Sequence, residues 1–181
     1  MTLKYMIKQI RLIKKEYRKK NSSIHGLAHI IRVGIMADRL NMNHYQFDYE
    51  IPWSLALLHD IGRENDAKDD NHGYKSVEKI NNWKIDINDY MKEAIINHPT
   101  KQKPESDYEK LLFDADRYDL IRLNYKLNRN FFSENFHSKY IVLAQYLGRF
   151  QNKQLLLDFC SQIEVSLYGM KILKRLLKKY I

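Results

Sequence analysis

Hydrophobic residues recur at intervals of three and four positions along most of the chain, which places them on one side of an α-helix. Residues 2–19 carry one such apolar stripe, made of Leu3, Met6, Ile10, Ile13 and Tyr17. Residues 24–41 carry another, made of Ile30, Val33, Ala37 and Leu40. The alternation of period two that would predict strands is scarce. The pattern therefore predicts helices separated by short polar connections.

A third helix is expected to open at Pro52, because a proline in the first helical turn loses no hydrogen bond. This helix is expected to end near Gly62. Further helices are predicted over about 74–80, 87–98 and 110–123, and from about 138 to the end. Residues 124–137 are expected to be irregular or one short helix. In the last stretch one stripe is traced by Leu156, Cys160, Ile163, Leu167 and Met170.

No change of composition marks a domain boundary, so the chain is predicted to be all-α, a single-domain helical bundle over residues 1–181. The segments that carry candidate chemistry lie within 25–123, between a basic N-terminal helix at 2–19 and C-terminal helices at 138–181.

Composition excludes several classes of protein. Hydrophobic residues make up 44% and charged residues 29%, which is typical of a globular chain. No apolar run is long enough to span a membrane, and the N-terminal residues lack the apolar core of a signal peptide. A single cysteine, Cys160, excludes an internal disulfide and a cysteine-based zinc site. A cytoplasmic protein with no membrane partner is expected.

The net charge of +9 is concentrated at the two ends of the chain. Residues 1–20 carry +7 and residues 171–181 carry +5, which leaves −3 for residues 21–170. Two interpretations remain open. The lysines and arginines can form solvated helix surfaces, or they can attract phosphate-rich ligands or nucleic acid, although no nucleic-acid-binding motif is present.

The stretch LALLHDIGRE, residues 55–64, joins an apolar run directly to a histidine and a carboxylate. Burying an ionised carboxylate is costly unless it is paired or holds a cation. His59 and Asp60 therefore require a partner. The dipeptide alone is weak evidence, since adjacent helical residues point about 100° apart and this spacing does not predict joint binding of one ion.

Two other residues are candidates for the same site. His29 lies four residues after His25, on the same side of a predicted helix. Asp116 falls within an apolar stripe, four residues from a leucine on either side. A structural alternative is that Asp116 pairs with a buried arginine such as Arg32 or Arg122.

Together, these residues form a set of two imidazoles and two carboxylates, namely His29, His59, Asp60 and Asp116. They come from three predicted helices whose apolar stripes must meet in one core. Nitrogen and oxygen ligands of this kind suit Mn, Fe, Ni, Co or Zn better than Ca. The sequence therefore predicts a divalent metal site.

The order of these residues resembles the HD superfamily of metal-dependent phosphohydrolases. HGLAHIIRV resembles the first motif with His29 as its ligand, LALLHDIGRE the second, and FDADRYDLIRL the last with Asp116 as its ligand. The resemblance runs from about residue 25 to residue 147, and DDNHGYKS and INHPT resemble segments of one bacterial branch. It implies the helical HD-domain fold, a divalent ion (Mn, Fe, Ni, Co, Zn or Mg) and a phosphoester substrate.

The resemblance also brings in two further histidines. His72 and His98 resemble helix-terminal positions beside the metal site of HD proteins, where they would hold a second ion, bind phosphate or protonate the leaving group. The alternative is that both are ordinary loop histidines. Arg63, Lys75 and Arg122 are the candidate phosphate-binding cations, although Arg122 can equally be structural.

The expected function is hydrolysis of a phosphoester, such as a nucleotide or another small phosphomonoester, by attack of a metal-bound hydroxide. Asp60 would hold the ion and orient the water, Arg63 would neutralise the phosphoryl oxygens, and His72 or His98 would protonate the departing alkoxide.

Three other functions are considered as alternatives. The first is an HD-type nuclease or phosphodiesterase acting on nucleic acid or cyclic nucleotides. The second is a catalytically silent module that binds metal or nucleotide. The third is a helical interaction protein without metal. Separately, the apolar stripe of the C-terminal stretch could form an oligomer interface.

Overall fold

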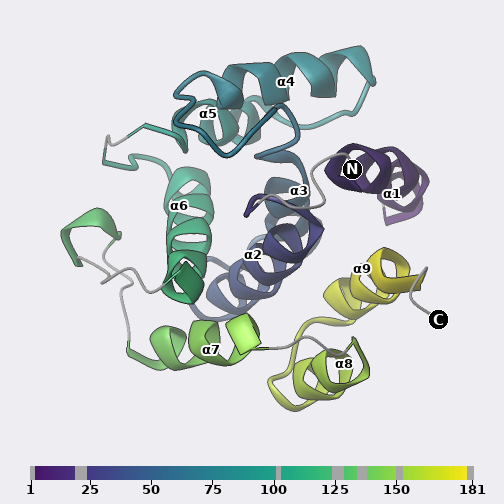
Figure 1. The fold of residues 1–181 in the computed structure, drawn as a ribbon, viewed down its shortest axis with the longest axis vertical. Helices are drawn as coiled ribbons and strands as arrows, with labels where there is room; N and C mark the ends of the chain where they lie inside the picture. The colour runs from purple at the N-terminus through teal and green to yellow at the C-terminus, as the bar shows by residue number, and fades with distance from the viewer. Residues whose placement is uncertain are drawn as a thin grey trace.

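Helix α2 (Leu27–Leu40) runs through the middle of the molecule, between α3 (Glu50–Leu58) and α6 (Asp107–Asp119) (Figure 1). The structure is a computed structural model, and it describes residues 3–18, 24–100, 103–123, 129–133, 138–149 and 153–178. Ten of the fourteen residues of α2 are buried. Gly34 permits the close packing of α3, because a Cβ atom there would lie 2.4 Å from the Trp53 ring.

The other helices surround this centre. α4 (His72–Asn82) and α5 (Asp89–Asn97) pack against each other at the top of the view, and α1 (Leu3–Arg18) lies at the right (Figure 1). α7 (Ser138–Arg149), α8 (Lys153–Gln162) and α9 (Leu167–Leu177) occupy the lower part. A π-helical turn (Asn41–Tyr45) and 3₁₀ turns (Leu120–Leu123 and Arg129–Phe131) complete the described segments.

The described residues contain no strand, and the predicted all-α fold is confirmed. Side chains from α1 to α9 join in one connected hydrophobic core. No helix of the described ranges is long and apolar enough to cross a membrane. The described ranges leave out residues 1–2, 19–23, 101–102, 124–128, 134–137, 150–152 and 179–181. The ends of the predicted N-terminal helix, most of the stretch at 124–137 and parts of the predicted C-terminal helices lie among these residues.

The predicted boundaries are wrong at α6, which begins at Asp107 rather than at residue 110. The Ser106 hydroxyl accepts a hydrogen bond from Glu109 N, and the Glu109 side chain accepts one from Ser106 N. This reciprocal capping box satisfies two backbone donors at the start of the helix.

The continuous C-terminal stripe is wrong as well, since the chain breaks between α8 and α9. Glu164 adopts a left-handed conformation with φ of 58°. The buried Asp38 carboxylate accepts hydrogen bonds from Ser166 N and from the Ser166 hydroxyl, both at 2.7 Å. Ser166 also caps α9. Leu167 is consequently 83% exposed instead of continuing the apolar stripe.

Candidate metal centre

The polar end of LALLHDIGRE lies on a tight turn, not in a helix that continues to Gly62 as predicted. α3 ends at Leu58. The Ser76 hydroxyl of α4 donates to His59 O at 2.6 Å and accepts from Gly62 N at 2.9 Å. A Cβ atom at Gly62 would lie 2.2 Å from Ser76 N, so only glycine allows α4 to approach this closely. The turn places His59 and Asp60 in a geometry that regular helical spacing would not give.

Four side chains converge at the first cluster: His29 from α2, His59 and Asp60 from the turn, and Asp116 from α6. His29 Nε2 lies 3.3 Å from His59 Nε2, 3.3 Å from Asp116 Oδ1 and 3.6 Å from Asp60 Oδ2. His59 Nε2 lies 3.7 Å from the same Asp60 and Asp116 oxygens. Ligands bound tetrahedrally at about 2.1 Å are separated by about 3.4 Å, so the donor atoms of His29, His59 and Asp60 are spaced to hold one ion. Asp116 lies beside both histidines of this group.

Asp60 also belongs to a second cluster with His72, at the start of α4, and His98, just after α5. Asp60 Oδ1 lies 3.0 Å from His72 Nε2 and 3.5 Å from His98 Nε2. Asp60, His72 and His98 could hold a metal ion, as could His29, His59 and Asp60. The two oxygens of one buried carboxylate therefore face two separate groups of donors.

The four imidazoles share one orientation, in which Nδ1 is directed at an oxygen outside the clusters. The acceptors are Asp119 for His29 (2.7 Å), Ala56 O for His59 (2.9 Å), Asp69 O for His72 and Ile95 O for His98 (2.6 Å). Carbonyl and carboxylate oxygens only accept hydrogen bonds, so each Nδ1 carries a proton. Each Nε2 then presents its lone pair to the clusters when the ring is neutral.

Two imidazole nitrogens that face each other with their lone pairs need a proton or a cation between them. His72 Nε2 and His98 Nε2 lie 2.8 Å apart, and their side chains are almost fully buried. Two acceptors this close repel each other unless one is protonated or a cation is bound. A histidine whose Nδ1 donates to an oxygen while Nε2 faces inward is the arrangement found in metal ligands. The chemistry of the donors therefore fits a metal ion in both clusters.

The ionisation of the first cluster follows from burial and from the facing charges. Burial disfavours charge on His29, but hydrogen bonds to Asp116 and Asp119 outweigh it and raise the pKa of His29 to about 9. Burial lowers the pKa of His59 to about 4. Burial also acts on Asp60 and Asp116, but the surrounding histidines hold the pKa of both carboxyls below the usual range. Both aspartates are ionised at neutral pH, as metal ligands must be.

Asp119 is the contributor that the sequence did not reveal. Its carboxylate accepts the Nδ1 proton of His29 and also binds Arg32 Nε at 2.5 Å and Arg122 Nε at 2.7 Å. Arg122 additionally donates to Ile24 O. The structural alternative, in which an aspartate pairs with Arg32 or Arg122, therefore occurs at Asp119 and not at Asp116. The sequence did hold one signal for Asp119, because a residue three positions after Asp116 lies on the same side of the helix.

The remaining predicted cations lie in different surroundings. Arg63 NH1 lies 3.0 and 3.2 Å from the two ring nitrogens of His72, and Arg63 Nε is buried with no hydrogen bond among the described residues. Lys75 lies farther out, where its Nζ pairs with Asp69 at 2.9 Å. Arg63 is therefore next to the second cluster, whereas Arg122 and Lys75 are already engaged by carboxylates.

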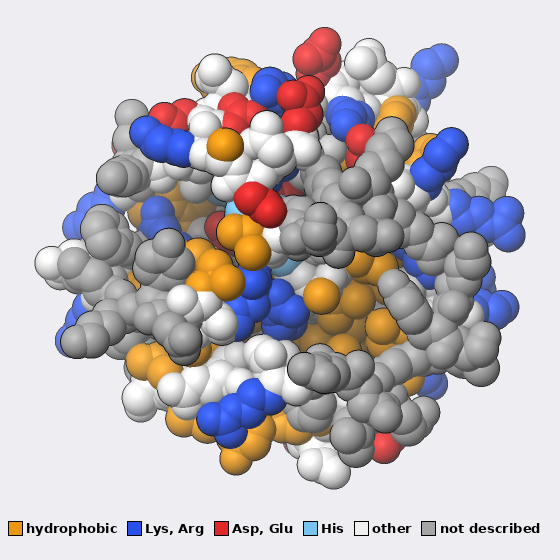
Figure 2. All heavy atoms as spheres, in the orientation of Figure 1, with side chains coloured by type: hydrophobic (Ala, Val, Ile, Leu, Met, Phe, Trp, Pro, Cys, Tyr) orange, Lys and Arg blue, Asp and Glu red, His pale blue; other side chains and the backbone are white. Residues whose placement is uncertain are grey.

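The first cluster opens toward solvent at Asp116. The Asp116 side chain is 28% exposed, compared with 4% for His29 and none for His59. Leu120, the next position of the predicted apolar stripe, is 38% exposed. Figure 2 shows histidine surface in a hollow at the centre of this face, between α2 and α6. A ligand can therefore approach from the α6 side.

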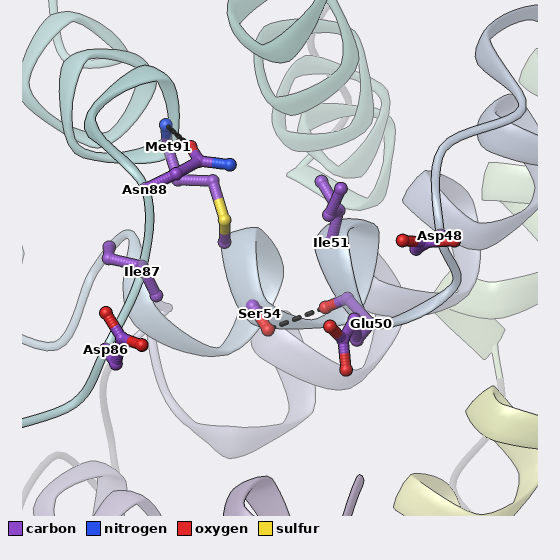
Figure 3. A pocket seen from close by; sticks show the side chains of 8 residues that line it. All are labelled: Asp48, Glu50, Ile51, Ser54, Asp86, Ile87, Asn88 and Met91. Atoms are coloured by element: carbon purple, nitrogen blue, oxygen red, sulfur yellow. Dashed lines mark hydrogen bonds between the residues drawn. The ribbon is translucent and has the colours of Figure 1, made fainter. Parts of the chain in front are cut away.

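A separate pocket of about 300 Å³ lies between the start of α3 and the segment before α5 (Figure 3). Asp48, Glu50 and Asp86 stand around it, and Ile51 and Met91 contribute apolar surface. It shares no lining residue with either cluster. Three carboxylates disfavour a phosphate there, so the pocket is not a candidate for the phosphoester.

The chain belongs to the HD-domain family, whose family model matches residues 26–121. This range contains all six residues of the two clusters, together with Asp119 and Arg63. Searches of curated proteins and of solved structures found no match to the chain. Membership of this family agrees with the all-α fold and with the histidine and aspartate clusters that could hold metal.

Proposed function

We propose that this protein is a metal-dependent phosphohydrolase that cleaves a small phosphomonoester, such as a nucleotide. The observation that carries the proposal is Asp60, whose two oxygens face two groups of inward-directed imidazole nitrogens. A buried carboxylate between two such groups is well suited to bridge a pair of cations. Pairs of metal ions about 3.5–4 Å apart act on phosphate esters in many hydrolases.

In this proposal His29, His59, Asp60 and Asp116 would hold one ion, and Asp60, His72 and His98 would hold a second. Imidazole and carboxylate ligands favour Mn, Fe, Co, Ni or Zn. When bound, such an ion polarises phosphoryl oxygens and lowers the pKa of a coordinated water to roughly 7. The hydrogen bonds from each Nδ1 keep the rings oriented for this role.

Arg63 is proposed as the phosphate-binding residue. Its guanidinium lies beside His72 with a buried Nε that no described residue satisfies, and a phosphoryl oxygen would supply the acceptor that is missing. Lys75 and Arg122 contribute positive potential, but their pairing with Asp69 and Asp119 leaves them less suited to direct contact.

The proton transfers divide among the remaining groups. His72 and His98 point Nε2 at Asp60 and use Nδ1 for backbone contacts, which supports a ligand role more than proton donation to the leaving group. Asp116 is the most exposed carboxylate of the clusters. It is therefore the group best placed to orient an entering water, while Asp60 holds the centre together.

The test compares Asp60→Asn with Asp89→Asn, the same chemical change at an 88% exposed side chain. Each protein is stripped with a chelator, reconstituted with Mn, Co, Ni or Mg, and assayed against a panel of nucleotides and phosphomonoesters. The expected result is turnover in the wild type and in Asp89→Asn, and its loss in Asp60→Asn with helicity retained. Full turnover in Asp60→Asn, or tight nucleotide binding without turnover in the wild type, would contradict the proposal.

A further inference from the structure

The two basic ends of the sequence lie side by side in the structure. α1 contains six lysines and arginines and one acid, Glu16. Residues 167–178, which comprise α9 and its C-cap, contain four lysines and arginines and no acid. α1 packs against α9, and Lys14 Nζ donates to Arg175 O, 161 residues away, at 3.2 Å. Folding therefore joins two separate basic segments into one surface, here called the α1–α9 surface.

The positive charge of this surface points outward. The exposed side chains include Arg11, Lys15, Lys171, Lys174, Arg175 and Lys178. Glu16 instead points toward α4, where its side chain is 15% exposed and binds Lys79 Nζ at 2.7 Å. Figure 2 shows lysines and arginines along the right-hand edge, over α1 and the end of α9. The outer side of the α1–α9 surface is therefore positively charged, and α9 has no acidic residue that would neutralise this charge.

The apolar sides of both helices are already used in the core. Ile10, Ile13 and Tyr17 of α1 are at most 4% exposed, and Ile172 and Leu173 of α9 are fully buried. A helix that lies in a membrane interface needs a free apolar side, and the side chains described for residues 9–17 of α1 and for α9 form none. Two exposed leucines, Leu12 and Leu167, are isolated on different helices. Binding at this surface must therefore depend on charge.

The spacing of the cations fits a polymer of phosphates. Residues 171 to 178, from α9 to its C-cap, extend over about 10 Å at a rise of 1.5 Å per residue. Duplex DNA presents one phosphate per 3.4 Å of axis on each strand, so α9 alone spans roughly three phosphates. Exposed α1 cations continue the same surface.

We propose that the α1–α9 surface binds the phosphate backbone of a nucleic acid, without reading its sequence. None of its residues belongs to the metal clusters, so this inference does not depend on the proposed hydrolase activity.

The experiment uses the full chain and a fluorescently labelled 20-nucleotide RNA, with a duplex DNA of the same length for comparison. Anisotropy titrations from 0.03 to 0.3 M salt, roughly, give the affinity and its salt dependence. The test variant carries Lys171→Gln, Lys174→Gln and Arg175→Gln. The matched control carries Lys68→Gln, Lys103→Gln and Lys139→Gln, which removes the same charge from exposed sites outside α1 and α9. Circular dichroism verifies that both remain helical.

Each phosphate contact contributes about 0.7 to the slope of log K against log salt for a single strand. Loss of three contacts should therefore reduce the slope by about 2, and the affinity at 0.1 M salt by roughly 100-fold. The control should stay within about twofold of the wild type.

Three outcomes would overturn the proposal: no binding by the wild type at low salt, equal losses in the test and control variants, or binding of anionic lipid vesicles but of neither nucleic acid. The last would identify a membrane surface, and replacing Leu12 and Leu167 by serine would then weaken vesicle binding.

Discussion

Asp119→Asn tests whether the α6 carboxylate behind His29 controls metal binding. Asparagine keeps the shape and one acceptor oxygen but removes the charge shared by His29, Arg32 and Arg122. Loss of an oxygen that orients a ligand histidine typically weakens metal binding by about 10- to 100-fold, which corresponds to roughly 1.4–2.7 kcal/mol. Asp119 is only 5% exposed as a side chain, so solvent cannot replace the lost interaction.

The same substitution should destabilise the fold. Arg32 and Arg122 are 14% and 15% exposed, and removing one partner from a buried ion pair costs about 3–5 kcal/mol. Because asparagine keeps one acceptor oxygen and both arginines are partly exposed, the expected loss of stability lies near the lower end of this range. Urea unfolding of the metal-free protein measures this loss of folding stability separately from the change in metal affinity.

The assay is competition for Mn or Co against a fluorescent chelator, at a temperature where the variant is fully folded. Asp107→Asn is the matched control, since it makes the same change on α6 at a side chain that is 61% exposed. An Asp119→Asn protein that is folded and binds metal as tightly as the control would refute the role assigned to Asp119.

Three further predictions follow from the same region. Ser76→Ala should lower the free energy of unfolding by about 1–3 kcal/mol, because His59 O and Gly62 N lose their shared partner; chemical denaturation measures it, and an unchanged midpoint would contradict it. Gly62→Ala should be destabilising by about 1–3 kcal/mol or more, because its Cβ would meet backbone 2.2 Å away; a neutral effect in the same assay would show that α4 does not pack as described. Metal uptake at pH 7.5 should release about one proton, because His29, with a pKa of about 9, must lose its proton, whereas His59, with a pKa of about 4, is already neutral. The metal affinity should therefore increase with pH up to about 9, and calorimetry in buffers of different ionisation enthalpy that detects no proton release would contradict this.

The sequence revealed the elements and the principal donors because these depend on local pattern. Intervals of three and four residues predicted the helices, and a carboxylate placed in an apolar stripe identified Asp116. The histidine beside Asp60 became informative only in combination with His29 upstream. These positions needed no knowledge of which helices touch.

The features that were missed depend on tertiary contacts. The end of α3 is set by Ser76, and the break before α9 is stabilised by Asp38, which lies 128 residues from Ser166. Asp119 looked like any polar residue of a helix end until Arg32 and His29 were placed beside it. Spacing along one helix cannot reveal which of two aspartates meets an arginine from another.

The central claim is that Asp60 lies between two metal sites, and counting the metal ions bound per chain tests it most directly. Elemental analysis of the reconstituted protein is performed on the wild type and on His98→Ala, which removes a donor from the second cluster alone. We expect about two ions per chain in the wild type and about one in His98→Ala. A wild type without metal, or a His98→Ala protein that keeps the wild-type count or loses all its metal, would contradict the account.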